Sequence, residues 1–367
     1  MSSLELTSKY LLFPAEPHFI GYWIEKEIIC HFISVSDSII YCTLHNNNFV
    51  TCNIEIKPTN LEKTHFLFSI HSNHDFVDNT HHQILTIASL CGGTQVISDS
   101  EDKTVKIWNV EDGSCIKTLE GHRSSMRCVC VVVGEKEEKE DLIVSGSHGK
   151  TLKVWNIEGK CLKTLQGHSS SIWCVISFDT KHVLSGSWDK TMKLWNVVDG
   201  EGVCIKTFEG HSSYVYCLCK YDEYHFLSGS YDKTVKFWNI SKEKCISTLT
   251  GHNHHVSCLI MIETGWPQNH KCVVSGSFDN TIRIWTLIVS ESCDDNALEN
   301  GIWNCLKILQ VNSYVYCLTL FRNRYLFAGQ EDGIVSVWDF GYPLVVNGIE
   351  IEEHLHANFK PLIIQNM

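Results

Sequence analysis

One sequence motif of about 12 residues recurs along the chain and limits the folds that the chain can adopt. Six clear copies, among them SGSWDKTMKLWN and SGSYDKTVKFWN, end at Asn109, Asn156, Asn196, Asn239, Thr286 and Asp339. A degenerate copy, CTLHNNNFVTCN, ends at Asn53 and has Cys52 where the others have Trp. The marker positions of the seven copies are therefore 52, 108, 155, 195, 238, 285 and 338. Because repeats of this length are stacked supersecondary units, we expect seven similar units in a single domain over residues 1–367.

Each unit has the pattern of four short strands. The first is a continuous apolar run, such as WCVISF at residues 173–178, which suits an inner strand buried on both faces. The second resembles HVLSGS, and the third, which resembles TMKLW, alternates with a period of two. The Asp and polar residues between them favour a tight turn. The fourth, CLKTLQGH, alternates as an outer edge strand does. The pattern predicts an all-β chain.

These residues resemble the WD-repeat (WD40) family, in which Gly-His is followed about 25–40 residues later by Trp-Asp or Trp-Asn. The five units from Trp108 to Trp285 carry the resemblance closely. The resemblance implies a seven-bladed β-propeller of four-stranded antiparallel blades over nearly the whole chain. The phrases SGSxDKT and CIKTxxGH are most similar to propellers of F-box/WD ubiquitin-ligase receptors, and a propeller of histone-methylation complexes is a second similar type.

The resemblance also implies a buried polar network in each blade, because buried polar groups have to be paired and a complete network fixes one geometry. Its members are the Gly-His imidazole, a serine, the turn aspartate and the tryptophan. The matching sets are His168, Ser185, Asp189, Trp195; His211, Ser228, Asp232, Trp238; His252, Ser275, Asp279, Trp285; and His81, Ser98, Asp102, Trp108. Gly149 replaces the aspartate in the third unit, and Val311 and Ala328 replace His and Ser in the last. We expect those two blades to be less rigid, and the network to be structural.

Closure of the ring requires an outer strand for the last unit, and no CLKTL-like segment follows Trp338. Residues 9–13, KYLLF, resemble such a strand. We expect them to complete the last blade, because pairing the two chain ends removes exposed sheet edges. Residues 344–353, LVVNGIEIEE, are the alternative closing segment, and residues 341–367 are expected to be a C-terminal tail.

The charge and hydropathy of the chain limit the classes of partner that it can bind. The chain has 30 Lys and Arg against 42 Asp and Glu, a net charge of −12, which disfavours binding to nucleic acid. No stretch approaches the roughly 18 apolar residues of a membrane span, so we expect no membrane insertion. The first residues, MSSLELTSKYLLF, lack the pattern of a secretory signal. We therefore expect an intracellular protein, cytoplasmic or nuclear.

Cysteine and histidine are abundant, but neither is spaced for a metal site. Ten of the 18 cysteines fall at two repeat positions: Cys115, Cys161, Cys204, Cys245, Cys305 and Cys128, Cys174, Cys217, Cys258, Cys317. With no CxxC pair, we expect reduced, buried thiols. The His-rich segments at 71–82 and 252–255 favour a solvated loop over a metal site. No nucleotide-binding, zinc-protease or serine-hydrolase motif occurs, so we expect no enzymatic activity, no cofactor and no metal.

In this family, two positions of each repeat surround the mouth of the central channel. The first position is the residue that enters the first strand, and its occupants in successive repeats are Arg127, Trp173, Tyr216, Ser257 and Tyr316. The second position is the residue before the turn aspartate, and its occupants are Glu101, His148, Trp188, Tyr231, Phe278 and Glu331. Exposed aromatic rings are typical of interaction hot spots and hold apolar or cationic side chains. The predicted partner-binding residues are Arg127, His148, Trp173, Trp188, Tyr216, Tyr231, Phe278 and Tyr316. The alternative is that the rings only fill the mouth.

We therefore expect a non-catalytic scaffold or adaptor, a monomeric propeller within a multiprotein complex, that binds a partner peptide on this face. The alternative is a substrate-receptor module of a ubiquitin ligase. The F-box/WD receptors read phosphorylated segments with several arginines, whereas this mouth has only Arg127 and has Trp173 and Trp188 at other arginine positions. The methylation-complex propeller inserts a partner arginine between aromatic rings, a placement that Trp173, Tyr216 and Tyr316 match better.

Overall fold

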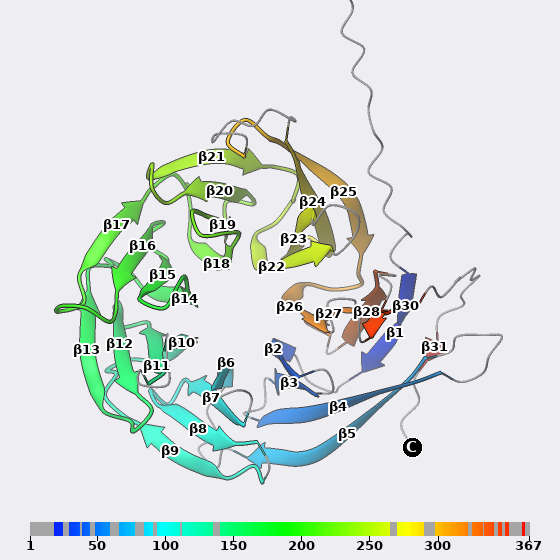
Figure 1. Cartoon of the computed structure of the whole chain (residues 1–367), viewed down its shortest axis with the longest axis horizontal. Helices are drawn as coiled ribbons and strands as arrows, with labels where there is room; N and C mark the ends of the chain where they lie inside the picture. The colour runs from blue at the N-terminus through cyan, green and yellow to red at the C-terminus, as the bar shows by residue number, and fades with distance from the viewer. Residues whose placement is uncertain are drawn as a thin grey trace, which may run out of the picture.

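In the computed structural model, antiparallel sheets are arranged radially around a central axis (Figure 1). The structure describes residues 18–24, 29–36, 39–44, 48–58, 66–77, 84–90, 94–110, 112–134, 140–264, 270–289, 298–321, 325–332, 334–340, 344–346, 349–351 and 362–363. In this part of the chain, no helix is long and apolar enough to cross a membrane.

The unit around Trp195 shows how the repeat builds a sheet. The four strands are β14 (Ile172–Ser177), β15 (His182–Ser187), β16 (Met192–Asn196) and β17 (Cys204–Phe208), paired in sequence order. The central strand β15 is almost entirely buried and β16 is buried at three of its five residues, whereas β17 buries only its last residue. The predicted order of one inner, two central and one outer strand is confirmed.

The same arrangement recurs in three further blades between β6 and β25 (Figure 1). Their strands are β6 (Ile84–Leu90), β7 (Gln95–Ser100), β8 (Val105–Asn109), β9 (Cys115–Leu119); β10 (Met126–Val132), β11 (Leu142–Ser147), β12 (Thr151–Asn156), β13 (Cys161–Gln166); and β18 (Val215–Lys220), β19 (His225–Ser230), β20 (Val235–Asn239), β21 (Lys244–Leu249). A fourth blade has longer strands: β22 (Val256–Thr264), β23 (His270–Ser277), β24 (Thr281–Ile288) and β25 (Ile302–Gln310).

The last repeat is completed by the N-terminal part of the chain. Strands β26 (Val315–Phe321), β27 (Tyr325–Gln330) and β28 (Ile334–Asp339) pair in order, and β1 (His18–Ile24) pairs antiparallel with β28. The N-terminal part therefore supplies the outer strand, as expected, but with residues 18–24. The predicted segment 9–13 lies outside the described residues. The alternative segment forms its own hairpin, β29 (Leu344–Val346) with β30 (Ile349–Ile351), and β31 (Leu362–Ile363) lies parallel to β1.

A further four-stranded sheet, containing the degenerate unit, lies between the sheets of β26 and β6 (Figure 1). Its strands are β2 (Ile29–Ser36), β3 (Ile39–Leu44), β4 (Asn48–Pro58) and β5 (Phe66–Val77).

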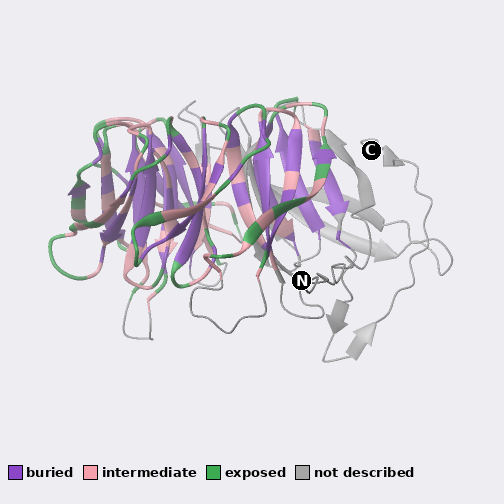
Figure 2. Cartoon of the chain, turned by 90° about the horizontal axis from the view of Figure 1, so that it is seen from above, coloured by how far each residue is buried: buried purple, intermediate pink, exposed green. Residues whose placement is uncertain are grey.

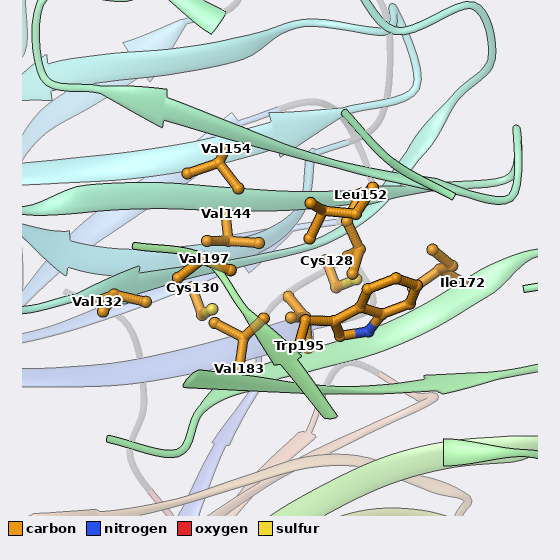
Figure 3. Close-up of a cluster of buried hydrophobic side chains, with 12 residues drawn as sticks. Cys128, Cys130, Val132, Val144, Leu152, Val154, Ile172, Val183, Trp195 and Val197 are labelled. Atoms are coloured by element: carbon orange, nitrogen blue, oxygen red, sulfur yellow. The ribbon is translucent and has the colours of Figure 1, made fainter. Parts of the chain in front are cut away.

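The core lies between adjacent sheets, whose central strands are buried (Figure 2). Figure 3 shows one such layer, in which Val144 and Val154 of one blade pack with Val183 and Trp195 of the next. Close approach of the sheets requires glycine in the second strand. A Cβ at Gly186 would lie 2.6 Å from Cys174 Sγ and 2.7 Å from Val215 Cγ1 of the next blade. The glycine of the repeated Ser-Gly-Ser sequence is therefore a packing requirement.

The prediction of buried thiols is confirmed for part of the cysteines. Cys128, Cys217, Cys317 and Cys272 are buried, and the 13 cysteines whose side chains the structure describes are free thiols. Cys115, Cys161 and Cys305 are exposed, because they lie on outer strands that have solvent on one side. Burial of those thiols was therefore wrongly predicted.

Candidate functional site

Each inner strand has a register shift at the residue that was predicted to enter the channel mouth. Pairing with the second strand skips Arg127, Trp173, Tyr216, Ser257 and Tyr316. A bulge releases a side chain from the alternating pattern of its strand and changes its direction. The repeat therefore presents one variable side chain per blade at this end of the ring, which we call the top face.

The turn between the second and third strands is fixed by the predicted network. In the β14–β17 blade, His168 Nδ1 lies 2.7 Å from Asp189 Oδ2, and His168 Nε2 lies 2.8 Å from Ser185 Oγ. Trp195 Nε1 donates to the same hydroxyl at 2.8 Å. The same contacts recur around His211 and His252. Three of the predicted sets are confirmed. They fix the turn that carries the second group of predicted mouth residues, those that precede the turn aspartate.

The other blades depart from this network in different ways. In the β6–β9 blade, Trp108 Nε1 donates to Ser98 Oγ at 2.8 Å, but His81 lies outside the described residues. In the β10–β13 blade, His122 Nε2 and Trp155 Nε1 both bond Ser145 Oγ, and Gly149 supplies no carboxylate. In the last blade, Gln330 Nε2 donates to Ser336 Oγ at 2.6 Å.

On the top face, four planar groups are stacked in series across three blades. The guanidinium of Arg127 lies 3.9 Å from the ring centre of Trp173. Trp173 stacks on Trp188 at 4.9 Å and 20°, and Trp188 stacks on Tyr214 at 5.1 Å and 21°. The edge of His148 faces both tryptophans, at 5.9 and 5.7 Å. Stacking of this kind holds the rings in fixed positions.

A second group of rings continues the series over the next blades. His255 stacks on Tyr216 at 5.0 Å and on Tyr231 at 5.1 Å. Phe278 lies 3.9 Å from His255 and stacks on Tyr314 at 4.7 Å. Trp173 and Tyr216 join the two groups edge to face at 5.0 Å. The rings therefore form one continuous surface. We call it the aromatic arc and define it as Arg127, His148, Trp173, Trp188, Tyr214, Tyr216, Tyr231, His254, His255, Phe278, Tyr314 and Tyr316.

The arc combines exposed rings with buried polar atoms that have no partner. Tyr214, Tyr231 and Tyr314 are 39%, 45% and 37% exposed. Trp188 Nε1 and His255 Nδ1 are buried and make no hydrogen bond. Burial, followed by the charge of His254, lowers the pKa of His255 to about 4, so this imidazole is neutral at physiological pH. A buried donor without an acceptor is costly, and a ligand carbonyl or hydroxyl would satisfy it.

The structure brings together the eight predicted site residues. The other predicted mouth residues lie elsewhere: Ser257 Oγ is turned to the backbone carbonyl of Val315, and Glu101 and Glu331 are exposed without joining the rings. Sequence reasoning missed Tyr214, His254, His255 and Tyr314. Tyr214 and Tyr314 each precede a predicted residue by two positions, in the sequence YVY. That spacing was the available signal.

Metal ligation was assessed only where the structure describes side chains. There, no group of three or more His, Cys, Asp or Glu is arranged to hold a metal ion. The segment 71–82 lies partly outside the described ranges.

Comparisons with known proteins show similarity in sequence and in fold. The chain is 37% identical over 71 residues to WD repeat-containing protein pop2 of Schizosaccharomyces pombe, covering 17% of this chain and 10% of that protein. It is 35% identical over 71 residues to nuclear distribution protein PAC1-2 of Uncinocarpus reesii, covering 19% and 14%. These matches thus span less than a fifth of either relative. The WD40 β-propeller domain of Doa1 has a similar fold, with a TM-score of 0.67 at 21% identity over 89% of this chain and 97% of that one.

The number of repeats corrects the predicted fold. The WD domain, G-beta repeat family matches residues 72–109, 113–156, 159–196, 202–239, 243–286 and 303–339. The matches are six, so the prediction of a seven-bladed propeller is wrong, and the chain has six WD blades. The degenerate unit is not among the matches. Its Cys52 replaces the tryptophan that elsewhere donates to the second-strand serine. The sheet β2–β5, which lies between the sheets of β26 and β6, is therefore not counted as a WD blade.

The matched repeats cover more than half of the chain, and the propeller fold agrees with them. The chain belongs to the WD40 repeat family.

Proposed function

We propose that this protein is a non-catalytic interaction scaffold that holds a peptide segment of a partner protein on the aromatic arc. Propellers of this family typically mediate contacts between proteins. The single observation that carries the proposal is the continuity of the arc, from Arg127 to Tyr314, with three exposed tyrosines at its surface. Large rings held in place lose little conformational entropy on binding, which is why they dominate interface energies.

The chemistry of the arc favours an apolar or planar side chain of the partner. Trp188 Nε1 supplies an unpaired hydrogen-bond donor among the rings, and His255 Nδ1 supplies an unpaired ring nitrogen that donates or accepts according to its tautomer. A donor at the edge of an apolar surface gives direction to a bound peptide, because it requires a carbonyl or hydroxyl at one place. The net charge of −12 supports a protein partner over a nucleic acid.

A substrate-receptor role in a ubiquitin ligase is the second candidate, because the repeat phrases resemble F-box/WD receptors. Recognition of a phosphorylated segment would need several guanidinium groups. Arg127 is the only arginine of the arc, and its guanidinium lies over the ring of Trp173. The arc therefore supports the scaffold proposal better. A monomeric state and an intracellular location remain predictions.

The test is capture of partners by the wild type and by the Trp173→Ala/Tyr216→Ala variant, with quantitative mass spectrometry. Each ring contributes about 2 kcal/mol or more at a hot spot, so removal of two rings costs about 4 kcal/mol and should lower partner affinity about 700-fold. The matched control is Tyr224→Ala, which removes a 58% exposed tyrosine from the turn between β18 and β19, at the opposite end of the blade. Retention of all specific partners by a folded double variant would overturn the proposal.

A further inference from the structure

One carboxylate is missing from the repeated network, and the groups that would bind it are present. In the three complete blades, one aspartate oxygen accepts from the histidine Nδ1 and from the backbone N–H of the next residue. The acceptors are Asp189, Asp232 and Asp279, and the backbone donors are Ser169, Ser212 and Asn253, at 2.9, 3.0 and 2.9 Å. The other oxygen accepts from the hydroxyl of Thr191, Thr234 or Thr281. In the β10–β13 blade, the equivalent residues are Gly149, His122, Arg123 and Thr151.

The turn around Gly149 keeps the geometry of the complete blades. Gly149 N donates to Ser147 Oγ at 3.0 Å, as Asp189 N donates to Ser187 Oγ at 3.1 Å. The next residue, Lys150, has a φ of 67°, and Lys190 has a φ of 72°. The blade therefore has the same turn and lacks only the carboxylate.

His122 is oriented toward the missing group. The imidazole is buried, with His122 7% exposed, and its Nε2 lies 2.9 Å from Ser145 Oγ. In the complete blades the histidine Nε2 faces the serine hydroxyl and Nδ1 faces the aspartate oxygen, which accepts the ring hydrogen. We assign His122 the same tautomer, with the ring hydrogen on Nδ1, because its Nε2 and Trp155 Nε1 meet Ser145 Oγ in the same way. His122 Nδ1 has no hydrogen-bond partner. A buried N–H donor thus points to the place where the other blades hold an aspartate oxygen.

The surroundings leave room for a ligand group. A Cβ at Gly149 would lie 3.4 Å from Ser147 Oγ and 3.5 Å from Ser124 Cβ, which are ordinary contacts. Gly149 and the flanking Lys150 are exposed, as is Arg123 on the facing loop. These two cations favour an anion at this position. Burial, followed by the charge of Lys153, lowers the pKa of His122 to about 4, so the imidazole is a neutral donor at physiological pH.

We propose that this position, the Gly149 site, binds the carboxylate of an aspartate or glutamate side chain of a partner protein. The partner's carboxylate would accept from His122 Nδ1 and from the backbone N–H of Arg123, and would complete the blade network from outside. In three other blades, an aspartate carboxylate binds the equivalent donors. A ligand of the Gly149 site should therefore have the size and the charge of a carboxylate. The inference goes beyond the proposed function, because binding at this site does not require the aromatic arc.

The site adjoins the arc on the top face. His148, a residue of the arc, immediately precedes Gly149, and its ring meets Trp173 and Trp188. A partner segment lying on the arc would therefore reach the Gly149 site with an acidic residue near one end. Together, the aromatic arc and the Gly149 site would select a partner segment in which an acidic residue lies next to an apolar or aromatic residue.

The test follows the imidazole N–H signal of His122 by NMR during titration with sodium acetate, at an ionic strength held constant with sodium chloride. The wild type is expected to show a saturable shift with acetate and none with chloride alone. Gly149→Asp places a carboxylate on the same donors, so its acetate affinity is expected to be at least about tenfold weaker. Gly149→Asn fills the same volume without charge and is expected to have the same effect. Gly149→Ala leaves the donors open and is expected to keep the response.

Three outcomes would overturn the proposal: no shift with acetate, an acetate response in Gly149→Asp and Gly149→Asn as strong as that of the wild type, or a shift with inorganic phosphate that acetate does not produce. The last result would assign the site to phosphoryl groups. Trp173→Ala separates this proposal from the proposed function, since it removes an arc residue and is expected to leave the acetate response unchanged. Loss of partners in the arc variant with a retained acetate response supports both proposals independently.

Discussion

Removal of the Asp232 carboxylate tests whether the polar network stabilises the blades. Its oxygens accept from His211 Nδ1 at 2.7 Å, from Ser212 N at 3.0 Å, and from the N–H and hydroxyl of Thr234 at 3.1 and 2.6 Å. The side chains of Asp232 and His211 are 7% and 0% exposed. In Asp232→Ala, all four donors lose this acceptor.

The magnitude follows from the burial of the pair. Hydrogen bonds to charged groups contribute about 1.5–3 kcal/mol each, but they are not additive in one cluster. Removing one member of a buried, hydrogen-bonded pair costs about 3–5 kcal/mol. With an unfolding entropy of about 2.1 cal/mol/K per residue, this loss lowers the melting temperature of a chain of 367 residues by about 4–6 °C.

The effect has a defined pH dependence. Burial raises the pKa of Asp232, but the hydrogen bond and charge of His211 and the Thr234 hydroxyl outweigh it and hold the pKa well below its usual range. Because the folded pKa lies below the unfolded value of 3.8, the stabilisation is present above about pH 4 and is lost as the pH falls through the folded pKa. The difference between wild type and variant should therefore narrow in acid.

The assay is thermal and urea denaturation followed by circular dichroism at pH 7 and at lower pH. The matched control is Asp199→Ala, which removes a carboxylate that is 62% exposed and lies 3.6 Å from Lys181 Nζ. We expect that control to change stability by less than about 1 kcal/mol. If Asp232→Ala were no more destabilising than the control, the network would not hold the blade, and the reasoning would be wrong.

Three further predictions concern other parts of the molecule. Burial raises the pKa of Asp99 to about 6, above the unfolded value of 3.8, so the native state binds one more proton than the unfolded state between these values. The free energy of unfolding should therefore decrease as the pH rises from about 4 to about 6, by about 3 kcal/mol, and urea titrations of Asp99→Asn across this range should lack that slope. Gly186→Ala forces a methyl group against Cys174 and Val215 and should destabilise the chain by about 1–3 kcal/mol by the same assay, whereas a neutral result would contradict close packing of the sheets. Trp188→Phe keeps a ring but removes the unpartnered Nε1–H; we expect about fivefold weaker partner binding and an unchanged melting temperature, and full affinity would show that this donor is not used.

The blade network was predictable from sequence because its members recur at fixed positions in each repeat. His168, Asp189 and Trp195 each fill one position of the motif, and the contacts are local to one blade. The same regularity misled the repeat count, because Cys52 occupies a marker position but cannot make the tryptophan hydrogen bond. The sequence did not predict that residues 18–24 form the outer strand of the last blade. Pairing of β1 with β28 joins segments about 300 residues apart, and no local pattern sets the register of such a pair.

The site was predictable only at the two motif positions that ring the channel. Tyr214 and Tyr314 lie outside those positions, and they join the arc because stacking on Trp188 and Phe278 brings them there. His255 appeared in the sequence as part of a polar loop, whereas in the structure it is buried between Tyr216 and Phe278. Such contacts depend on the approach of neighbouring blades, which a single repeat does not encode.

The central claim is that the partner lies on the aromatic arc, and site-specific photo-crosslinking in cells tests it most directly. A benzophenone amino acid placed at Tyr231, which is 45% exposed within the arc, is expected to crosslink to a distinct partner. The same probe at Tyr224, which is 58% exposed at the opposite end of the same blade, is expected not to crosslink to that partner. Specific crosslinks at Tyr224 and none at Tyr231 would contradict the account.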